Sequence, residues 1–120
     1  MSNYRTTETT IQTKLRPIGE MLAGITPNAF HYWRSAPKGV NAYIVWAEDE
    51  EAASLEADNY KQIQGIHGTI DYFTKTEFDS TVDEIQDGLN ELENVSWRLS
   101  SVQYEDETTF IHHEWEFWVR

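Results

Sequence analysis

The chain has 120 residues, 39% of them apolar and 13% aromatic, which fits one folded domain with a core of large side chains and excludes disorder over most of its length. Its formal net charge of -12 would repel phosphate-rich partners across most of the surface, which argues against a general nucleic-acid-binding role. The absence of cysteine excludes disulfides, thiolate metal ligands and thiol nucleophiles.

The first predicted element is an amphipathic helix, because apolar residues recur four and three positions apart. Its apolar stripe is Ile11, Leu15, Ile18, Leu22 and Ile25. Pro17 cannot donate a backbone hydrogen bond and clashes with the preceding turn, so the helix should start or kink there. We expect the polar residues 1–10 before it to form a mobile arm.

The middle of the chain favours strands. Residues 29–33 have the aromatic content of a short strand, and residues 40–47 are apolar on both alternating faces, as in a central strand covered on both sides. Residues 48–59 are too charged for a strand, so we expect an exposed loop or a short solvated helix. Residues 64–74 alternate as in a half-buried strand, with Ile66, Ile70 and Tyr72 on one face and His67, Thr69 and Asp71 on the other.

A second amphipathic helix follows, and its outer face is acidic. Its predicted buried stripe is Phe78, Val82, Ile85, Leu89 and Leu92. Either Thr76 or Asp79 could cap its first turn, since both side chains can accept a hydrogen bond from a backbone N–H.

Two strands should end the chain. The apolar phase of residues 96–104 shifts between Leu99 and Val102, which indicates a bulge at Ser100 and Ser101, and residues 105–108 would form a hairpin loop. The last strand should bury Ile111, His113, Trp115, Phe117 and Val119 and leave His112, Glu114, Glu116 and Trp118 on the opposite face. Because tryptophan is enriched at interface hot spots, we expect Trp118 to contact a partner.

These elements predict a single α+β domain over residues 1–120, in the order α-β-β-β-α-β-β. The expected architecture is an antiparallel sheet of four to five strands with two helices packed on one face. The other face, which carries Tyr43, His67, Thr69 and Trp118, is too aromatic for plain solvent surface, so we expect something to cover part of it.

The charge is distributed unevenly along the chain. Residues 1–46 carry five basic and two acidic side chains, whereas residues 47–93 carry two basic and 14 acidic ones. Such unlike regions suit contact between neighbouring copies, and the candidate interface residues are Arg34, Lys38, Glu48, Asp49, Glu50, Glu51 and Trp118. The simpler interpretation is an acidic face that keeps the protein soluble.

No stretch approaches the roughly 18 apolar residues of a membrane span, and the first ten residues lack the apolar core of a signal peptide. We therefore expect a soluble intracellular protein with no membrane partner.

The sequence contains no phosphate-binding loop, nucleophile elbow or His-Glu-x-x-His helix. His112 and Glu114 could supply two metal ligands, but His112 and His113 point to opposite faces of a strand and cannot share an ion. Only Asp71 and Glu20 are carboxylates among apolar residues, and neither has an identifiable partner. We therefore expect no catalytic residue, no metal and no cofactor; an enzyme acting through His67 or Asp71 is the least favoured alternative.

Four segments carry a family resemblance: RSAP at residues 34–37, AYIVW at 42–46, GIHGTIDYFT at 65–74 and YEDETTFIH at 104–112. Their succession resembles the tail-terminator, or tail-completion, proteins of long-tailed bacteriophages and prophages, over roughly residues 15 to 119. The heavily acidic second half departs from that family.

The resemblance implies a small α+β structural protein without catalytic residues. It would cap the tail tube as a ring, typically a hexamer, end tail growth and give the head connector a docking surface. The implied partners are other copies of the chain, the tail-tube protein and the head–tail connector protein, while DNA passes through the channel without specific binding. The implied location is the head-proximal end of the virion tail, and the host cytoplasm during assembly.

An alternative from another class is an acidic DNA mimic that inhibits a nucleic-acid-binding protein. Its surrogate phosphates would be Glu48, Asp49, Glu50, Glu51, Asp83, Glu84, Asp87 and Glu91. A mimic should bind a basic partner one to one and be displaced by DNA or salt, whereas a terminator should form rings and bind tail tubes.

Overall fold

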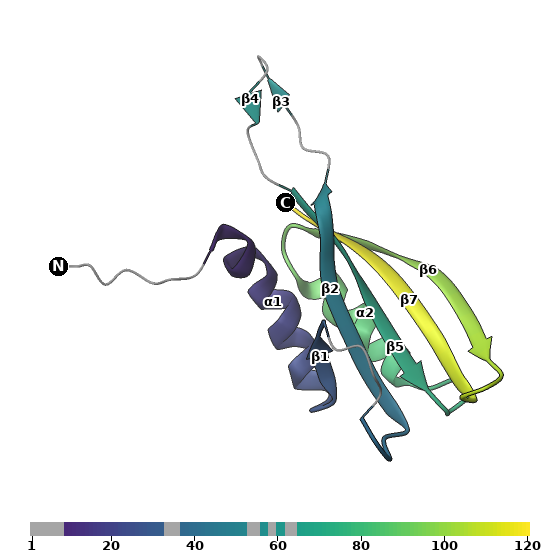
Figure 1. Ribbon diagram of the computed structural model, residues 1–120. Coiled ribbons are helices and arrows are strands. Elements are labelled where there is room, and N and C mark those ends of the chain that lie inside the picture. Colours follow the sequence, from purple (N-terminus) through teal and green to yellow (C-terminus); the bar gives the residue numbers. More distant parts are fainter. Residues whose placement is uncertain (1–8, 33–36, 53–55, 58–59, 62–64) are drawn as a thin grey trace.

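The computed structural model describes residues 9–32, 37–52, 56–57, 60–61 and 65–120, and it has the predicted α+β fold (Figure 1). The elements are α1 (Thr10–Ile25), β1 (Ala29–His31), β2 (Ala42–Ala52), β3 (Glu56–Ala57), β4 (Tyr60–Lys61), β5 (Gly65–Thr74), α2 (Thr81–Glu91), β6 (Val95–Glu105) and β7 (Phe110–Val119). Five strands form one sheet in the order β1-β2-β5-β7-β6, and β3 pairs with β4 in a separate ribbon. Only β1 and β2 pair in parallel, so the sheet is mixed.

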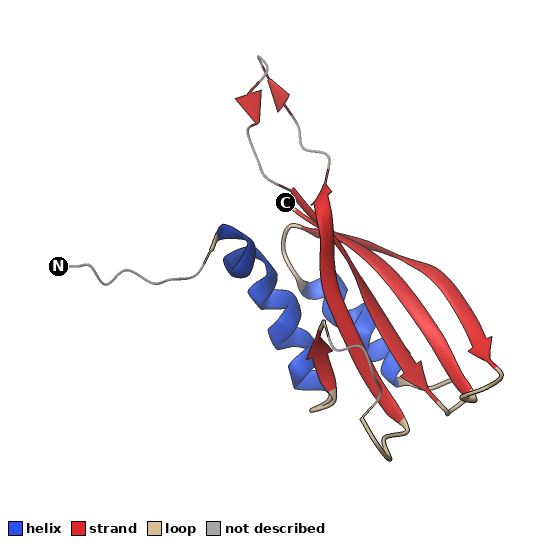
Figure 2. Cartoon of the chain, viewed as in Figure 1, coloured by secondary structure: helices blue, strands red, loops and turns tan. Residues whose placement is uncertain are grey.

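The two helices lie on one face of the sheet, as predicted, and the core fills the space between (Figure 2). The fully buried residues at its centre are Ile18 and Leu22 of α1, Ile85 of α2, and Ile44, Ile70, Trp115 and Phe117 of the sheet. The helical period of 3.6 and the strand period of two bring these positions to the same layer. Among the described residues, neither helix is long and apolar enough to cross a membrane.

The first helix begins earlier than the sequence predicted. The Oγ1 of Thr9 accepts a hydrogen bond from the N–H of Gln12 at 3.0 Å, and α1 runs from Thr10 through Pro17. A start at Pro17 is therefore wrong: this proline is exposed, so its ring does not displace the core and water can reach the backbone beside it. Thr9 and Thr10 belong to the helix and its cap, while the other residues of the expected mobile arm, 1–8, lie outside the described part.

The acidic segment after Trp46 continues the strand, which corrects the prediction of a loop or helix over residues 48–59. β2 extends to Ala52, pairs with β5 as far as Gly65 and has a register shift between Glu48 and Glu50. The strand tolerates these charges because Glu48 accepts hydrogen bonds from His31 and Tyr32, and Asp49 bonds to His67.

The second helix begins at Thr81, later than its apolar stripe suggested. Phe78 has a φ of 54°, which interrupts helical geometry, and its side chain is 95% exposed, so its predicted place in the core is wrong. Ser80 occupies the N-cap position, so the prediction that Thr76 or Asp79 caps the helix is wrong; Asp79 Oδ1 instead accepts from the N–H of Thr81 at 2.9 Å from the turn before it. Burial raises the pKa of Asp79. Hydrogen bonds from Thr74, Tyr72 and Thr81 lower it by more, so this pKa lies below its usual value.

The last two strands confirm the predicted bulge and the alternation of faces, but of the residues predicted to be buried, Ile111 and His113 are only partly buried. The register of β6 against β7 shifts between Leu99 and Ser101, and β6 and β7 are joined by a turn. Trp115 and Phe117 face the helices, while His112 and Trp118 face the other side, since they pair with Phe73 and His67 of β5.

Candidate interaction surfaces

The sheet face opposite the helices, here called the open face, is polar and aromatic. Its residues are Tyr43, Val45, His67, Thr69, Asp71, Phe73, Phe110, His112, Glu114, Glu116 and Trp118. The ring of Phe73 stacks on Tyr43 at 4.7 Å and on His112 at 4.2 Å between centroids. The aromatic side chains of the open face therefore cover one another in part, as the prediction of a partly covered face requires. Tyr43 is buried in this way, without a helix above it.

His67 joins two carboxylates across three strands of the open face. Its Nδ1 lies 2.6 Å from Asp49 Oδ1, and its Nε2 lies 2.9 Å from Glu116 Oε1. Arg98 contacts the other oxygen of Glu116. Burial lowers the pKa of His67, but the hydrogen bonds and charges of Asp49 and Glu116 outweigh burial, so this pKa lies above its ordinary value.

His112 has a similar setting further along the same face. Its Nε2 lies 2.7 Å from Asp71 Oδ1, and its Nδ1 lies 3.6 Å from Glu105 Oε2. The hydrogen bond to Asp71 raises the pKa of His112, burial lowers it, and the nearby carboxylates leave it above the ordinary value. Both imidazoles therefore favour the protonated form, in which each can donate from both nitrogens.

These two histidines predict a pH-dependent part of the stability. Because the pKa of each is higher in the folded state, their contribution is full below about pH 6.5, the ordinary histidine pKa, and is lost as pH rises through the folded-state values. We expect the double variant His67→Gln, His112→Gln to lose less stability than the wild type between mildly acidic and mildly alkaline pH. Urea unfolding at a series of pH values measures this, and parallel curves for the two proteins would contradict it.

Within the described part of the chain, two clusters on the open face hold enough ligand atoms for a metal ion, with the ligand atoms of each within 4.8 Å of one another. They are Asp49, Glu50 and His67, and Asp71, His112 and Glu114. The opposite directions of His112 and His113 are confirmed, since His113 pairs with Tyr72 on the helix face. Asp71 as a partner of His112 was missed, because only the β5–β7 register brings these residues together.

We expect removal of metals to leave the fold intact. In both clusters the imidazole already makes hydrogen bonds to carboxylates, and the core beneath the sheet is apolar. Dialysis against a chelator should therefore leave the melting temperature unchanged. A fall of many degrees that zinc restores would show instead that one of these clusters holds a structural ion.

Trp118 lies on the open face as predicted, but it is half-buried. Its ring meets the ring of His67 edge-on at a centroid distance of 5.2 Å. Trp118→Ala should lower the free energy of unfolding by about 1–2 kcal/mol, between the values typical of surface and buried positions. Urea denaturation measures this cost, and a variant that fails to fold would show that Trp118 is a core residue.

The other predicted interface residues do not form one surface. Arg34 lies outside the described residues, and Lys38 is exposed in the loop before β2. Burial raises the pKa of Glu48, yet hydrogen bonds from Tyr32 and His31 lower it below the ordinary value. Asp49 is bonded to His67, while Glu50 and Glu51 are exposed. Glu50 Oε2 also lies 3.8 Å from His67 Nδ1, so these carboxylates interact within the chain and do not form a free acidic patch.

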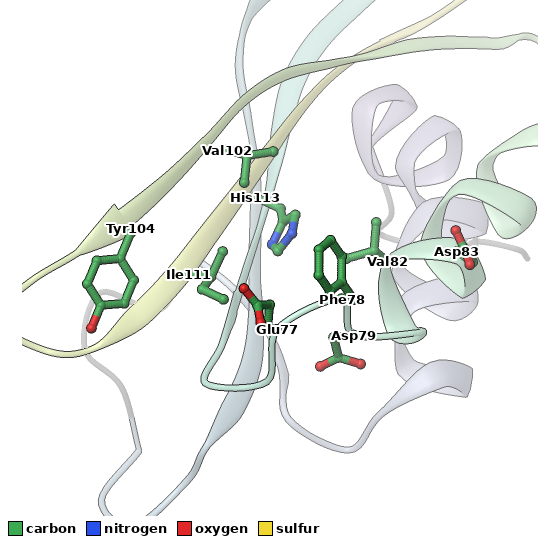
Figure 3. A pocket seen from close by; sticks show the side chains of 9 residues that line it. All are labelled: Glu77, Phe78, Asp79, Val82, Asp83, Val102, Tyr104, Ile111 and His113. Carbon is green, nitrogen blue, oxygen red and sulfur yellow. The ribbon is translucent and has the colours of Figure 1, made fainter.

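A groove that sequence reasoning missed lies between the start of α2 and the outer part of the sheet, and we call it the β6 groove (Figure 3). It has a volume of about 670 Å³ and is lined by Phe78, Val82, Val102, Tyr104, Ile111 and His113, with Glu77, Asp79 and Asp83 around it. Val102 is 52% and Tyr104 60% exposed. Burial lowers the pKa of His113, which favours its uncharged form. The largely apolar floor of the groove is therefore surrounded by an acidic rim of Glu77, Asp79 and Asp83.

A smaller groove lies near the opposite edge of the sheet, between α1 and β1, and we call it the α1–β1 groove. It has a volume of about 260 Å³ and is lined by Gln12, Leu15, Arg16, Gly19, His31 and Trp46, with Glu20 at its edge. Glu20 is exposed there, so the expectation that it sits among apolar residues is wrong. The outward side of an amphipathic helix is open to solvent.

Comparison of the sequence with protein-family models and with curated proteins finds no match in either case.

Proposed function

We propose that this protein is a phage tail terminator, which caps the tail tube as a ring of identical copies, ends tail growth and gives the head connector a docking surface. The observation that carries the proposal is that the two edges of the sheet are unlike. One edge is strand β6, beside the β6 groove, and the other edge is strand β1, beside the α1–β1 groove.

A closed ring of identical copies requires two different surfaces on each subunit. In a head-to-tail interface, one surface of each subunit meets a different surface of the next, and a suitable rotation closes the series. β6 is an 11-residue edge strand with exposed Leu99, Val102 and Tyr104, and edge strands of this kind favour contact with another chain. The order of helices and strands also agrees with the small α+β protein that the sequence resemblance implies.

The proposal is tested by tube assembly in vitro. Tail-tube protein is allowed to polymerise with and without this protein, and tube length is followed by electron microscopy. We expect addition of the protein to stop elongation at one end of each tube. Tubes that continue to grow at both ends would contradict a terminator role.

A DNA mimic is favoured by one observation, the exposed acidic side of α2, which carries Asp83, Glu84, Asp87 and Glu91. The internal bonds of Glu48 and Asp49 remove two carboxylates from the set that such a mimic would present. Tight one-to-one binding to a basic DNA-binding protein, reversed by DNA, would replace the terminator proposal with this one.

A further inference from the structure

We propose that the β6 groove binds a basic amphipathic helix of another protein. The apolar side of that helix would lie on the floor of the groove, and its lysine or arginine side chains would lie beside the acidic rim. The groove is complete in a single chain, so this binding goes beyond the proposed function and does not depend on ring formation.

The apolar surface of the groove is open to solvent. Phe78 is almost fully exposed, Val102 and Tyr104 are exposed by more than half, and no other aromatic ring contacts Phe78 or Tyr104 within the described residues. Leu99 is also exposed and points to the same side of β6, since it pairs with the buried Trp115. Exposed apolar side chains that gather in one place are typical of an interaction site.

The floor of the groove belongs to the side of the sheet that carries the helices. Val102 pairs with His113 and Tyr104 with Ile111, and these β7 residues alternate in phase with the fully buried Trp115. Figure 1 shows the arrowhead end of β6 extending past α2, so α2 does not cover this end. Helices cover the same side of the sheet elsewhere, and a helix from another chain would extend that layer.

The size of the groove suits several side chains at once. Its volume is about 670 Å³, and an amphipathic helix presents a row of apolar residues three and four positions apart. Figure 3 shows Phe78 and Val82 on one wall, with Val102, Tyr104 and Ile111 across from them on the strands. The partner helix would therefore lie between the start of α2 and the two outer strands.

The rim of the groove carries negative charge that the described part of the chain does not neutralise. The carboxylates of Glu77 and Asp83 are exposed and have no hydrogen bond or ion pair among the described residues. The described residues that line the groove include no lysine and no arginine. Basic side chains on the flanks of a partner helix would supply the opposite charge, which orients the two molecules and speeds their encounter.

The turn that presents Phe78 is held in place by hydrogen bonds. Phe78 has a φ of 54°, and Oδ2 of the next residue, Asp79, accepts from Tyr72 at 2.7 Å and from Thr74 at 2.6 Å. The ring is therefore presented on a fixed support, which lowers the entropy lost on binding.

The helices of a second copy have the wrong chemistry for this groove. The apolar stripe of α1 is buried in its own core, where Leu15, Ile18 and Leu22 are no more than 4% exposed. The exposed side of α2 is acidic, so the carboxylates of the rim would repel it. A helix that is both basic and apolar must come from a different protein.

The test uses a designed peptide as the probe. It is a fluorescent, N-acetylated peptide of leucine and lysine with the helical spacing LKKLLKLLKKLLKL, and its binding to the full chain is followed by fluorescence anisotropy. One comparison peptide alternates leucine and lysine, as in a strand, and the other is the helical peptide with glutamate in place of lysine. Amide NMR shifts of Val102, Tyr104 and Ile111 report whether the probe lies in the groove.

Two variants break the groove, and each has a matched control. Phe78→Asn removes the ring but keeps a residue that tolerates a positive φ, and Tyr32→Asn makes the same kind of change at an exposed aromatic residue of positive φ outside the groove. The double variant Glu77→Gln, Asp83→Asn removes the charge of the rim. Its control is Glu84→Gln, Asp87→Asn, which removes the same two charges from exposed positions of α2 outside the groove.

We expect the wild type to bind the basic helical peptide more tightly than either comparison peptide, with shifts at the three groove amides. Phe78→Asn should raise the dissociation constant about 30-fold, as for loss of a hot spot, while Tyr32→Asn leaves it unchanged. The rim double variant should raise it about fivefold at low salt and less at high salt, and its control should change it less.

Four outcomes would each overturn the inference. They are no binding of the basic helical peptide, equal or tighter binding of a comparison peptide, the same effect in a groove variant and its control, and shifts that spare the groove. Sedimentation velocity of the protein alone gives one more: self-association that Phe78→Asn abolishes would show that a second copy occupies the groove.

These outcomes are separable from the proposed function. If the peptide binds in the groove but the protein fails to stop tube growth, the groove assignment stands and the terminator role falls. If the protein stops tube growth but does not bind the peptide, the terminator role stands and the groove assignment falls.

Discussion

Replacing Leu89 with alanine should lower the free energy of unfolding by about 2–5 kcal/mol. Leu89 is 1% exposed and packs with Ile85 between α2 and the sheet, so truncation removes buried surface and leaves a cavity. A domain of this size has a total stability of about 5–15 kcal/mol, so the variant could be partly unfolded at 37 °C. Urea denaturation gives the difference directly.

The matched control for this prediction is Asp87→Ala on the exposed side of the same helix. It changes helix composition without touching the core, and its effect should stay within about 0.5 kcal/mol. Equal effects of the two substitutions would mean that α2 is not packed on the sheet as described.

The second large effect is expected from Gly68→Ala in β5. A Cβ at this position would lie 2.4 Å from Phe117 Cζ and 2.5 Å from the carbonyl oxygen of Ala47. Phe117 is fully buried and Ala47 belongs to the paired strand, so neither can move without disturbing the sheet. We expect a loss of about 1–3 kcal/mol, the usual cost of overpacking a core, measured by thermal and urea unfolding.

Gly24→Ala provides a control of opposite sign. Gly24 lies in α1, is exposed, and a Cβ there would meet nothing within 4 Å. Alanine should raise the stability by about 0.5–1 kcal/mol, because it lowers the entropy of the unfolded chain and favours the helix. If both substitutions stabilised the protein, the close approach of Phe117 to Gly68 would be wrong.

The sequence predicted the elements whose periodicity is read locally. The strict alternation around Trp115 and Phe117 assigned each side chain of the last strand to its face, and the phase change before Val102 located the bulge. Phe78 shows where this method fails. It continues the apolar spacing of the second helix, but its positive φ places it outside the helix and in solvent, and spacing carries no information about φ.

The prediction for the acidic segment after Trp46 was wrong for a different reason. Its charge argues against a strand, but Asp49 forms a hydrogen bond with His67 on the neighbouring strand, 18 residues further along the chain. The pairing of Asp71 with His112 likewise joins residues 41 positions apart. Such contacts depend on strand order and register, which were not predicted, so the polar network of the open face could not be assembled from the sequence.

The surfaces proposed for assembly were predicted only in part. The charge distribution predicts two unlike regions, but Phe78, which the helical spacing assigns to the core, is exposed, and Glu48 and Asp49 form hydrogen bonds within the chain. The α1–β1 groove combines side chains from a helix and two strands, so it depends on tertiary packing that no local pattern reveals.

The most direct test of the terminator role is negative-stain electron microscopy of the purified protein mixed with tail tubes that lack a terminator. The account predicts closed rings seated at one end of each tube, with the six-fold symmetry expected from the family resemblance, and no further growth at that end. Bare tube ends, with the protein remaining a free monomer of 14.0 kDa in the same mixture, would contradict it.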